Sequence, residues 1–150
     1  MHRFIASWFG TGLLLRQIRG SDDGSGTVGS VAALALVWLI GPDRWEWQVA
    51  AAIGVTALSI WSSRPFASEG DPGWIVVDEA AGTIVATVGL GPLPGVIAFA
   101  VFRFADATKV LPGISAAERL RGSWGITADD ILAGLYALGV GWIVHALTQL

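Results

Sequence analysis

The sequence predicts an all-α protein: a compact multi-helix, membrane-associated bundle with four or five apolar helices, some of them short or broken. Three observations lead to this prediction. The chain of 150 residues is 53% hydrophobic and only 14% charged, whereas soluble domains carry about 25% charged residues. Its apolar blocks are separated by clear turn signals. Tryptophans stand at several block ends, as they do at membrane interfaces; a soluble bundle with core tryptophans is the alternative.

Length, charge and cysteine content limit the function. The 150 residues suit one domain, residues 1–150. A net charge of −3 without a basic run argues against a nucleic-acid partner. Cysteine is absent, which excludes disulfides, zinc–thiolate sites and a cysteine phosphatase mechanism.

The first twenty residues contain a short apolar run that Arg16 and Arg19 interrupt. A membrane-spanning helix takes about 20 apolar residues, so this run is too short to cross a bilayer. No cleavable signal peptide is evident. We expect an amphipathic segment that lies at the membrane surface.

Five apolar blocks follow, separated by turns at 41–44 and 91–95 and by a polar connection at 106–128. The blocks occupy residues 28–40, 47–61, 74–90, 96–104 and 131–147. We expect four or five helices from them, two of which form a broken pair. Small residues such as Gly82, Gly134 and Gly139 recur inside the blocks, which favours close helix packing in lipid.

Tryptophans mark the second and third blocks. Trp45 and Trp47 open the second block, Trp61 closes it, and Trp74 opens the third. An indole favours hydrocarbon for its ring and the headgroup layer for its N–H group. We therefore expect these four rings at the membrane boundary.

Two segments carry the capping-box pattern of a helix start. Ser115 is followed three residues later by Glu118, and Thr127 by Asp130. The pattern gives Glu118 a capping role. It leaves capping as an alternative role for Asp130.

Five carboxylates lie in or beside apolar blocks: Asp78, Glu79, Asp106, Asp129 and Asp130. Carboxylates at membrane depth are costly unless they are paired or bind a metal. Neighbours on a helix point about 100° apart, so each adjacent pair can flank a cleft. Mg²⁺ prefers such hard oxygen ligands and is often shared with substrate phosphate. The residues therefore predict an Mg²⁺ site that handles a phosphate at headgroup level.

Two cations accompany these carboxylates. Arg103, Asp106 and Lys109 are spaced i, i+3, i+6, which brings them close to one face if the helix continues. Arginine can bind phosphate bidentately and lysine supplies a point charge. Two intrahelical ion pairs, from Asp106 to Arg103 and to Lys109, are the alternative.

Three segments resemble elements of the phosphatidylglycerophosphatase A family. Residues 75–82, IVVDEAAG, are similar to its IVxDExxG element; residues 102–112, FRFADATKVLP, to FRxxDxxKPxP; and residues 125–134, GITADDILAG, to GxxxDDxxAG. Order and spacing match as well. The N-terminal match, FGTGL at 9–13 and GTVGS at 26–30, is looser: the segment between them is longer and lacks the family's prolines. Val110 also stands where a proline commonly follows the lysine.

The resemblance implies a bacterial, Mg²⁺-dependent phosphomonoesterase that converts phosphatidylglycerophosphate to phosphatidylglycerol in phospholipid biosynthesis. It implies catalytic roles for a set of four acidic residues: Asp78, Glu79, Asp106 and Asp130. It implies metal ligands in an overlapping set: Asp78, Glu79, Asp129 and Asp130. Arg103 and Lys109 would stabilise charge on the phosphoryl group, and the 26–27 loop, through Thr27, would contact phosphate. Attack by water and attack by a carboxylate both remain open.

Basic residues in the first twenty positions and around the polar connection favour a cytoplasmic side for the site, in a bacterial inner membrane. The expected partners are the lipid substrate and the membrane, and a homo-oligomer is left open. A histidine-type lipid phosphatase is disfavoured, since only His2 and His145 are available. The main alternative function is a non-enzymatic membrane scaffold or a small ion-conducting transporter.

Overall fold

The computed structural model describes residues 1–69 and 72–150, and its regular structure is helical throughout those two ranges. The α-helices are α1 (His2–Ala6), α2 (Thr11–Arg19), α3 (Ser25–Ile40), α4 (Trp45–Ser63), α5 (Val77–Thr87), α6 (Pro92–Thr108), α7 (Ile114–Glu118) and α8 (Ser123–Leu147). Two 3₁₀ turns join them, η1 (Pro42–Arg44) and η2 (Arg64–Glu69). The prediction of an all-α bundle is confirmed.

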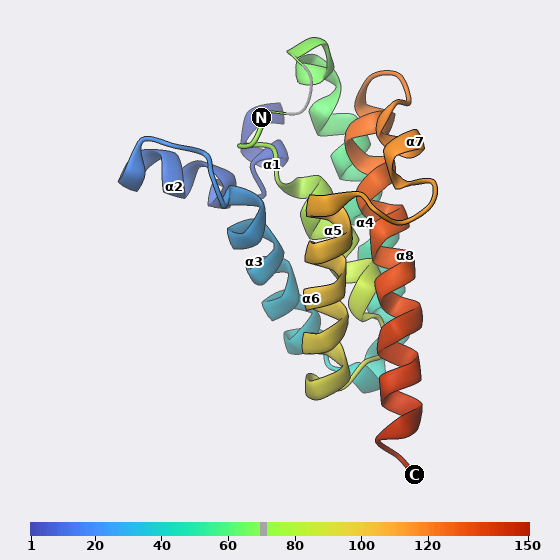
Figure 1. Cartoon of the computed structure of the whole chain (residues 1–150). Helices are drawn as coiled ribbons and strands as arrows, with labels where there is room; N and C mark the ends of the chain where they lie inside the picture. The colour runs from blue at the N-terminus through green and yellow to red at the C-terminus, as the bar shows by residue number, and fades with distance from the viewer. Residues whose placement is uncertain (70–71) are drawn as a thin grey trace.

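Helix α5 is the centre of the bundle, and it packs against α3, α4, α6 and α8 (Figure 1). The four surrounding helices run along the long axis of the molecule, while α1, α2 and α7 gather near one end (Figure 1). We call that end the site end and the remaining length of α3, α4, α5, α6 and α8 the shaft. Most α5 side chains are fully buried, so the shaft has a continuous core.

Helix boundaries differ from the predicted blocks in the second half of the chain. The third block begins as buried non-helical chain: Ile75 and Val76 precede α5, and the Val76 N–H donates to the Ala6 carbonyl at 2.9 Å. This bond to α1 satisfies a backbone donor outside any helix. Helix α6 begins at Pro92, inside the predicted turn at 91–95, and both α6 and α8 extend into the predicted polar connection at 106–128. The acidic motifs therefore lie on helices.

The two predicted capping boxes are wrong. Helix α8 starts after Gly122, which leaves Thr127 and Asp130 in the second and third turns. The Thr127 hydroxyl donates to the Ser123 carbonyl at 3.1 Å, and its oxygen lies 2.7 Å from the Ser59 hydroxyl of α4. Asp130 is therefore not a helix cap.

Helix α7 likewise starts after Gly113, so Ser115 is not its cap. The Ser115 hydroxyl instead donates to the Lys109 carbonyl at 3.3 Å. The glycine in each linker adopts a positive φ, which serves the turn in place of a side-chain cap.

Small residues allow α5, α6 and α8 to approach closely. A Cβ atom on Gly134 would lie 2.6 Å from the Gly82 carbonyl oxygen, and one on Gly82 would lie 2.5 Å from the Phe102 ring. The predicted packing role is confirmed for these two glycines. It is wrong for Gly139, whose Cβ position has no neighbour within 4 Å among the described residues.

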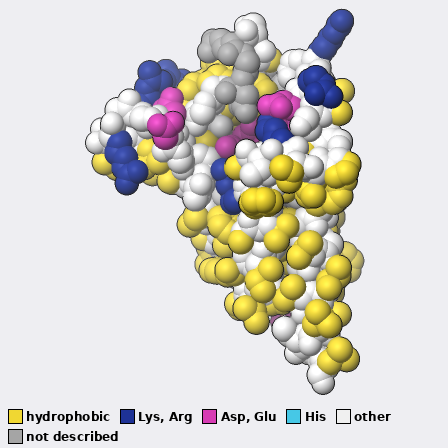
Figure 2. Space-filling view, in the orientation of Figure 1, with side chains coloured by type: hydrophobic (Ala, Val, Ile, Leu, Met, Phe, Trp, Pro, Cys, Tyr) yellow, Lys and Arg dark blue, Asp and Glu magenta, His cyan; other side chains and the backbone are white. Residues whose placement is uncertain are grey.

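The exterior of the shaft is apolar. Large side chains on α4, α6 and α8 are more than half exposed, as for Trp47 at 70% and Ile143 at 63%, and yellow atoms cover most of the shaft in Figure 2. Trp74 was predicted at the boundary but is buried, with its ring edge-on to Phe66. Small residues inside and large apolar residues outside reverse the order expected of a water-soluble core.

By length and hydropathy, one helix in the described ranges is able to cross a membrane, α8. A second candidate is the bent pair Ser25–Ile40 with Pro42–Ser68, which turns by 89° at its break. The described structure thus contains one or two candidate membrane-spanning helices. The prediction of four or five apolar helices is therefore not confirmed.

Candidate active site

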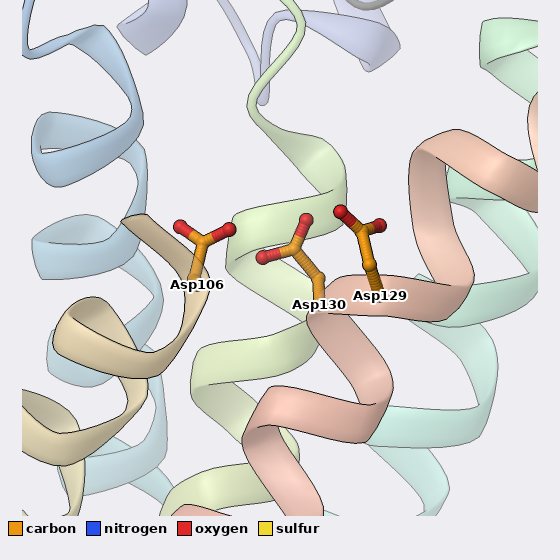
Figure 3. A group of neighbouring side chains, drawn as sticks. All are labelled: Asp106, Asp129 and Asp130. Atoms are coloured by element: carbon orange, nitrogen blue, oxygen red, sulfur yellow. The ribbon is translucent and has the colours of Figure 1, made fainter. Parts of the chain in front are cut away.

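Three carboxylates from two helices meet at the site end. Asp106 lies near the end of α6, and Asp129 and Asp130 lie in the first half of α8. An oxygen from each lies within 4.8 Å of the others, and Figure 3 shows Asp106 and Asp130 facing each other across the gap between the helices. We call these three residues the acidic cluster. Asp129 and Asp130 are buried and Asp106 is partly buried.

Close helix packing brings the cluster together. The Asp130 carbonyl oxygen would lie 2.8 Å from a Cβ on Gly82, so α8 crosses α5 at backbone distance there. The Phe102 ring of α6 lies 2.5 Å from the same Cβ position. Gly82 of α5 therefore allows α6 and α8 to pack closely enough to bring their acidic residues together.

Helix α5 adds Asp78 and Glu79 in its first turn, where the helix dipole favours negative charge. Burial is the largest influence on Glu79 and raises its pKa to about 7, with the charge of Asp106 acting in the same direction. A hydrogen bond with Asp78 and the charge of Arg103 oppose this rise. Glu79 is therefore electrostatically linked to α6, and the three predicted acidic segments converge.

Arg103 and Lys109 neutralise part of this charge. Arg103 Nη1 donates to Asp106 Oδ2 at 2.8 Å, so the first of the two alternative intrahelical ion pairs forms. Lys109 does not continue that face, because α6 ends at Thr108 and Lys109 adopts a left-handed conformation with φ 50°. Its ammonium group donates to Asp129 Oδ2 at 2.7 Å and also to Glu118. The alternative ion pair between Asp106 and Lys109 is replaced by these two.

The pKa values reflect this crowding. Burial, together with the charge of Asp129, raises the pKa of Asp106, although Arg103 and Lys109 oppose the shift. Burial acts to lower the pKa of Lys109, but its hydrogen bonds to Asp129 and Glu118 outweigh burial and keep that pKa above its usual range. The site therefore holds more negative charge than its two cations balance.

The first turn of α3 completes the wall of the site. A Cβ on Gly26 would lie 2.1 Å from Glu79 Oε1 and 3.1 Å from Arg103 Nη2. A glycine at this position allows the α3 backbone to come this close to both side chains in their present positions. Thr27 is exposed, so the residue that this turn places against the charged groups is Gly26.

A cavity of about 260 Å³ lies beside the acidic cluster. Asp129, Glu118 and two glycines, Gly122 and Gly125, are among its lining residues. The capping-box pattern predicts only a capping role for Glu118. Its contact with Lys109, nine residues earlier in the chain, is not predicted by any local sequence pattern.

These residues form a suitable donor set for a hard divalent cation. Two buried carboxylate oxygens, Glu79 Oε2 and Asp129 Oδ1, have no hydrogen-bond partner among the described residues. The groups that meet here offer oxygen ligands, which Mg²⁺ prefers. The acidic cluster fits such an ion, whereas Asp78 and Glu79, also predicted as ligands, are not part of the group of oxygens within 4.8 Å. Arg103 and Lys109 each contact a carboxylate of the cluster.

Comparisons with known proteins agree with this chemistry. A sequence model of the family described as Phosphatidylglycerophosphatase A matches residues 4–145. A Bacteroides thetaiotaomicron protein named "Putative phosphatidylinositol-3-phosphatase" is 30% identical over 145 residues, covering 89% of this chain and 86% of that protein. Haemophilus influenzae Phosphatidylglycerophosphatase A is 38% identical over 78 residues, about half of each chain (50% and 48%). No solved structure matches.

Proposed function

The chain belongs to the phosphatidylglycerophosphatase A family, and from that premise we propose that its acidic cluster binds Mg²⁺ and removes the terminal phosphate of phosphatidylglycerophosphate. The family makes the chain a lipid phosphatase of the phosphatidylglycerophosphatase type. The observation that carries the metal-site proposal is the approach of Asp106, Asp129 and Asp130 within 4.8 Å of one another.

The metal ligands would come from the acidic cluster, with Glu79 and Asp78 of α5 beside it. When bound, Mg²⁺ supplies positive charge that neutralises the phosphoryl oxygens. Arg103 would bind one face of the phosphoryl group, because its guanidinium already lies against Asp106. Lys109 would bind another, since its ammonium group already contacts Asp129.

The chemical step breaks the bond between phosphorus and the glycerol oxygen. In the direct route a water oxygen attacks phosphorus, a carboxylate accepts the water proton, and the leaving alkoxide gains a proton. Glu79 is a candidate for this proton transfer, because it is a carboxylate in the first turn of α5 and lies against Gly26 at the wall of the site. In the covalent route a carboxylate attacks first and water then cleaves the aspartyl phosphate. A single turnover of substrate labelled in its terminal phosphate, stopped with acid, distinguishes the two routes. Only the covalent route leaves the label on the protein.

Helix α8 supports the proposal that the site lies at a membrane boundary. Residues 131–147 are apolar and rise about 25 Å, close to the roughly 30 Å of bilayer hydrocarbon. If α8 spans, Asp129 and Asp130 lie at one boundary, where the substrate phosphate is found. We place this boundary on the cytoplasmic side of a bacterial inner membrane, as the basic residues near the site favour.

A second lipid phosphate is also a candidate substrate. The Bacteroides relative, which matches most of the chain, is named for a phosphatidylinositol phosphate. Both candidates are phosphomonoesters of a polyol carried on a diacylglycerol phosphate. The same cluster chemistry serves either, so the test compares both lipids.

Phosphate release from each lipid, with Mg²⁺ and with chelator, tests the proposal. We expect release from phosphatidylglycerophosphate that stops with chelator and returns when Mg²⁺ is added. Release that is unchanged by chelator would refute the metal assignment. A scaffold or ion-conducting transporter would release no phosphate from either lipid.

A further inference from the structure

Helix α2 carries an exposed apolar face that the bundle does not cover. Leu14 and Ile18 lie one turn apart on α2 and are 44% and 75% exposed. At about 100° per residue, Arg16 points about 160° away from each of these two side chains. Arg16 and Arg19 are both exposed. The helix therefore separates an apolar face from a basic one.

The beginning of α2 is held by the bundle. A Cβ on Gly12 would lie 2.2 Å from the Trp74 carbonyl oxygen, so this end is wedged against the core. The last turns project away from the bundle, crosswise to α3 and α8 (Figure 1). Four consecutive residues, 16–19, are exposed. We call α2 the arm.

We infer that the arm lies flat on an anionic lipid surface, with Leu14 and Ile18 in the acyl boundary and the arginines among the headgroups. Its orientation supports this: if α8 runs along the membrane normal, a helix crosswise to α8 lies in the membrane plane. Its charge supports it too, because Arg19 and Arg16 complement anionic phospholipids, although Arg16 Nη1 also lies 3.6 Å from Asp22 Oδ2. Apolar insertion and basic headgroup contacts together are what bind interfacial helices.

The arm would also set the depth of the site. Its last residue, Arg19, is followed after a short turn by α3, whose first turn carries Gly26. Gly26 lies directly against Glu79 and Arg103. A short connection thus links the lipid-bound arm to the wall of the acidic cluster. The inference rests on the proposed lipid substrate for its choice of surface.

The chain has no cysteine, so a single introduced cysteine gives a unique probe site. The test uses full-length Leu14→Cys, Ile18→Cys and Arg16→Cys, each labelled with an environment-sensitive fluorophore. Each labelled protein is reconstituted in vesicles of phosphatidylglycerol and phosphatidylcholine, some with brominated acyl chains. We expect bromine to quench probes at 14 and 18, and to leave the matched probe at 16 unquenched.

Two results would overturn the inference. One is equal quenching at 16 and 18, or none at either position. The other is efficient disulfide cross-linking of unlabelled Ile18→Cys chains without quenching at 18, which would assign the face to a second copy. A further expected result is that Arg16→Gln with Arg19→Gln weakens quenching at 18 in anionic vesicles; unchanged quenching would refute the electrostatic part.

Quenching does not depend on turnover, so it separates this inference from the proposed function. Quenching at 18 in a protein that releases no phosphate would support the arm and refute the function. Full phosphate release from a protein whose arm probes are all unquenched would support the function and refute the arm.

Discussion

The site end and the shaft use the same three helices in opposite ways. At the site end, α5, α6 and α8 bring carboxylates and two cations together, with Asp129 and Asp130 buried at about 3% exposure. Along the shaft, α5, α6 and α8 meet through small residues, such as Ala98 and Ala137, both fully buried. One region therefore concentrates charge at a cost in stability, and the other supplies the packing that offsets this cost.

The shaft also contains a buried polar side chain, Gln48, whose hydrogen bonds go to backbone groups. Gln48, fully buried on α4, donates to the Gly41 carbonyl at 2.9 Å and accepts from the Gly89 N–H at 2.7 Å. It thereby satisfies backbone groups at the ends of α3 and α5. At the site end, Glu79 and Asp129 each keep a buried oxygen without a hydrogen-bond partner in the described chain. Buried hydroxyl oxygens such as Thr83 Oγ1 of the shaft also lack a partner among the described residues, so the site end differs in that its unsatisfied oxygens belong to carboxylates, which can bind a cation.

The largest expected effect comes from removing one charge at the site end. Asp130→Asn should lower phosphate release by about 10²- to 10³-fold, the usual loss when one charge-stabilising group is removed. The folded protein should not lose stability, because the change relieves repulsion among clustered carboxylates. Initial rates and thermal unfolding of the same preparation measure the two quantities.

A variant with normal turnover would remove Asp130 from the site. A variant that unfolds would mean that the carboxylate is structural. The matched control is Glu46→Gln, which neutralises an exposed carboxylate in the first turn of α4, at the opposite end of the bundle. Its turnover should match that of the unmodified protein.

The second prediction addresses the shaft through two glycines of α8. Gly134→Ala places a methyl group 2.6 Å from the Gly82 carbonyl oxygen, and such overpacking costs about 1–3 kcal/mol. Gly139→Ala meets no atom within 4 Å in the described structure and should gain up to about 1 kcal/mol from helix propensity. Unfolding in detergent compares them, and equal stabilities would contradict the packing assigned to Gly134.

The third prediction concerns pH in metal-free protein. The pKa of Glu79 is about 7 in the folded chain against an ordinary value of 4.5, so the folded state binds its proton more tightly. This contribution to stability is fully present below about pH 4.5 and is lost as pH rises through 7. Glu79→Gln, measured with chelator, should flatten the fall in unfolding temperature over this range. A profile as steep as that of the unmodified protein would contradict the burial assigned to Glu79.

The smallest effect is expected at the rim of the site. Glu118 is half exposed at 48%, and Lys109 keeps its bond to Asp129 without it. Exposed ion pairs contribute about 0–1 kcal/mol, so Glu118→Gln should lower turnover by less than about fivefold. Lys109→Met should lower it much more, because the cation itself is lost. Equal losses in steady-state assays would mean that Glu118 has a direct role.

Much of this arrangement could be read from single segments. The apolar blocks predicted α3 and α4 closely, and the acidic motifs predicted which carboxylates to follow. Predictions failed where one segment's conformation depends on another. Ile75 and Val76 are buried outside a helix because Val76 bonds to α1, and the capping boxes failed because glycine linkers start α7 and α8 earlier than the boxes suggested.

The sequence by itself determined the helical class, the family, and the identity of the acidic and basic residues near apolar helices, because periodicity and motif spacing are local properties. Only the tertiary structure decided which of these charges meet. Lys109 turns from the face of Arg103 toward Asp129, twenty residues further along the chain, and Gly26 of α3 lies against Glu79 of the neighbouring α5. Such partners depend on how closely helices cross. That distance is set by the side chains of both helices together, so neither segment encodes it alone.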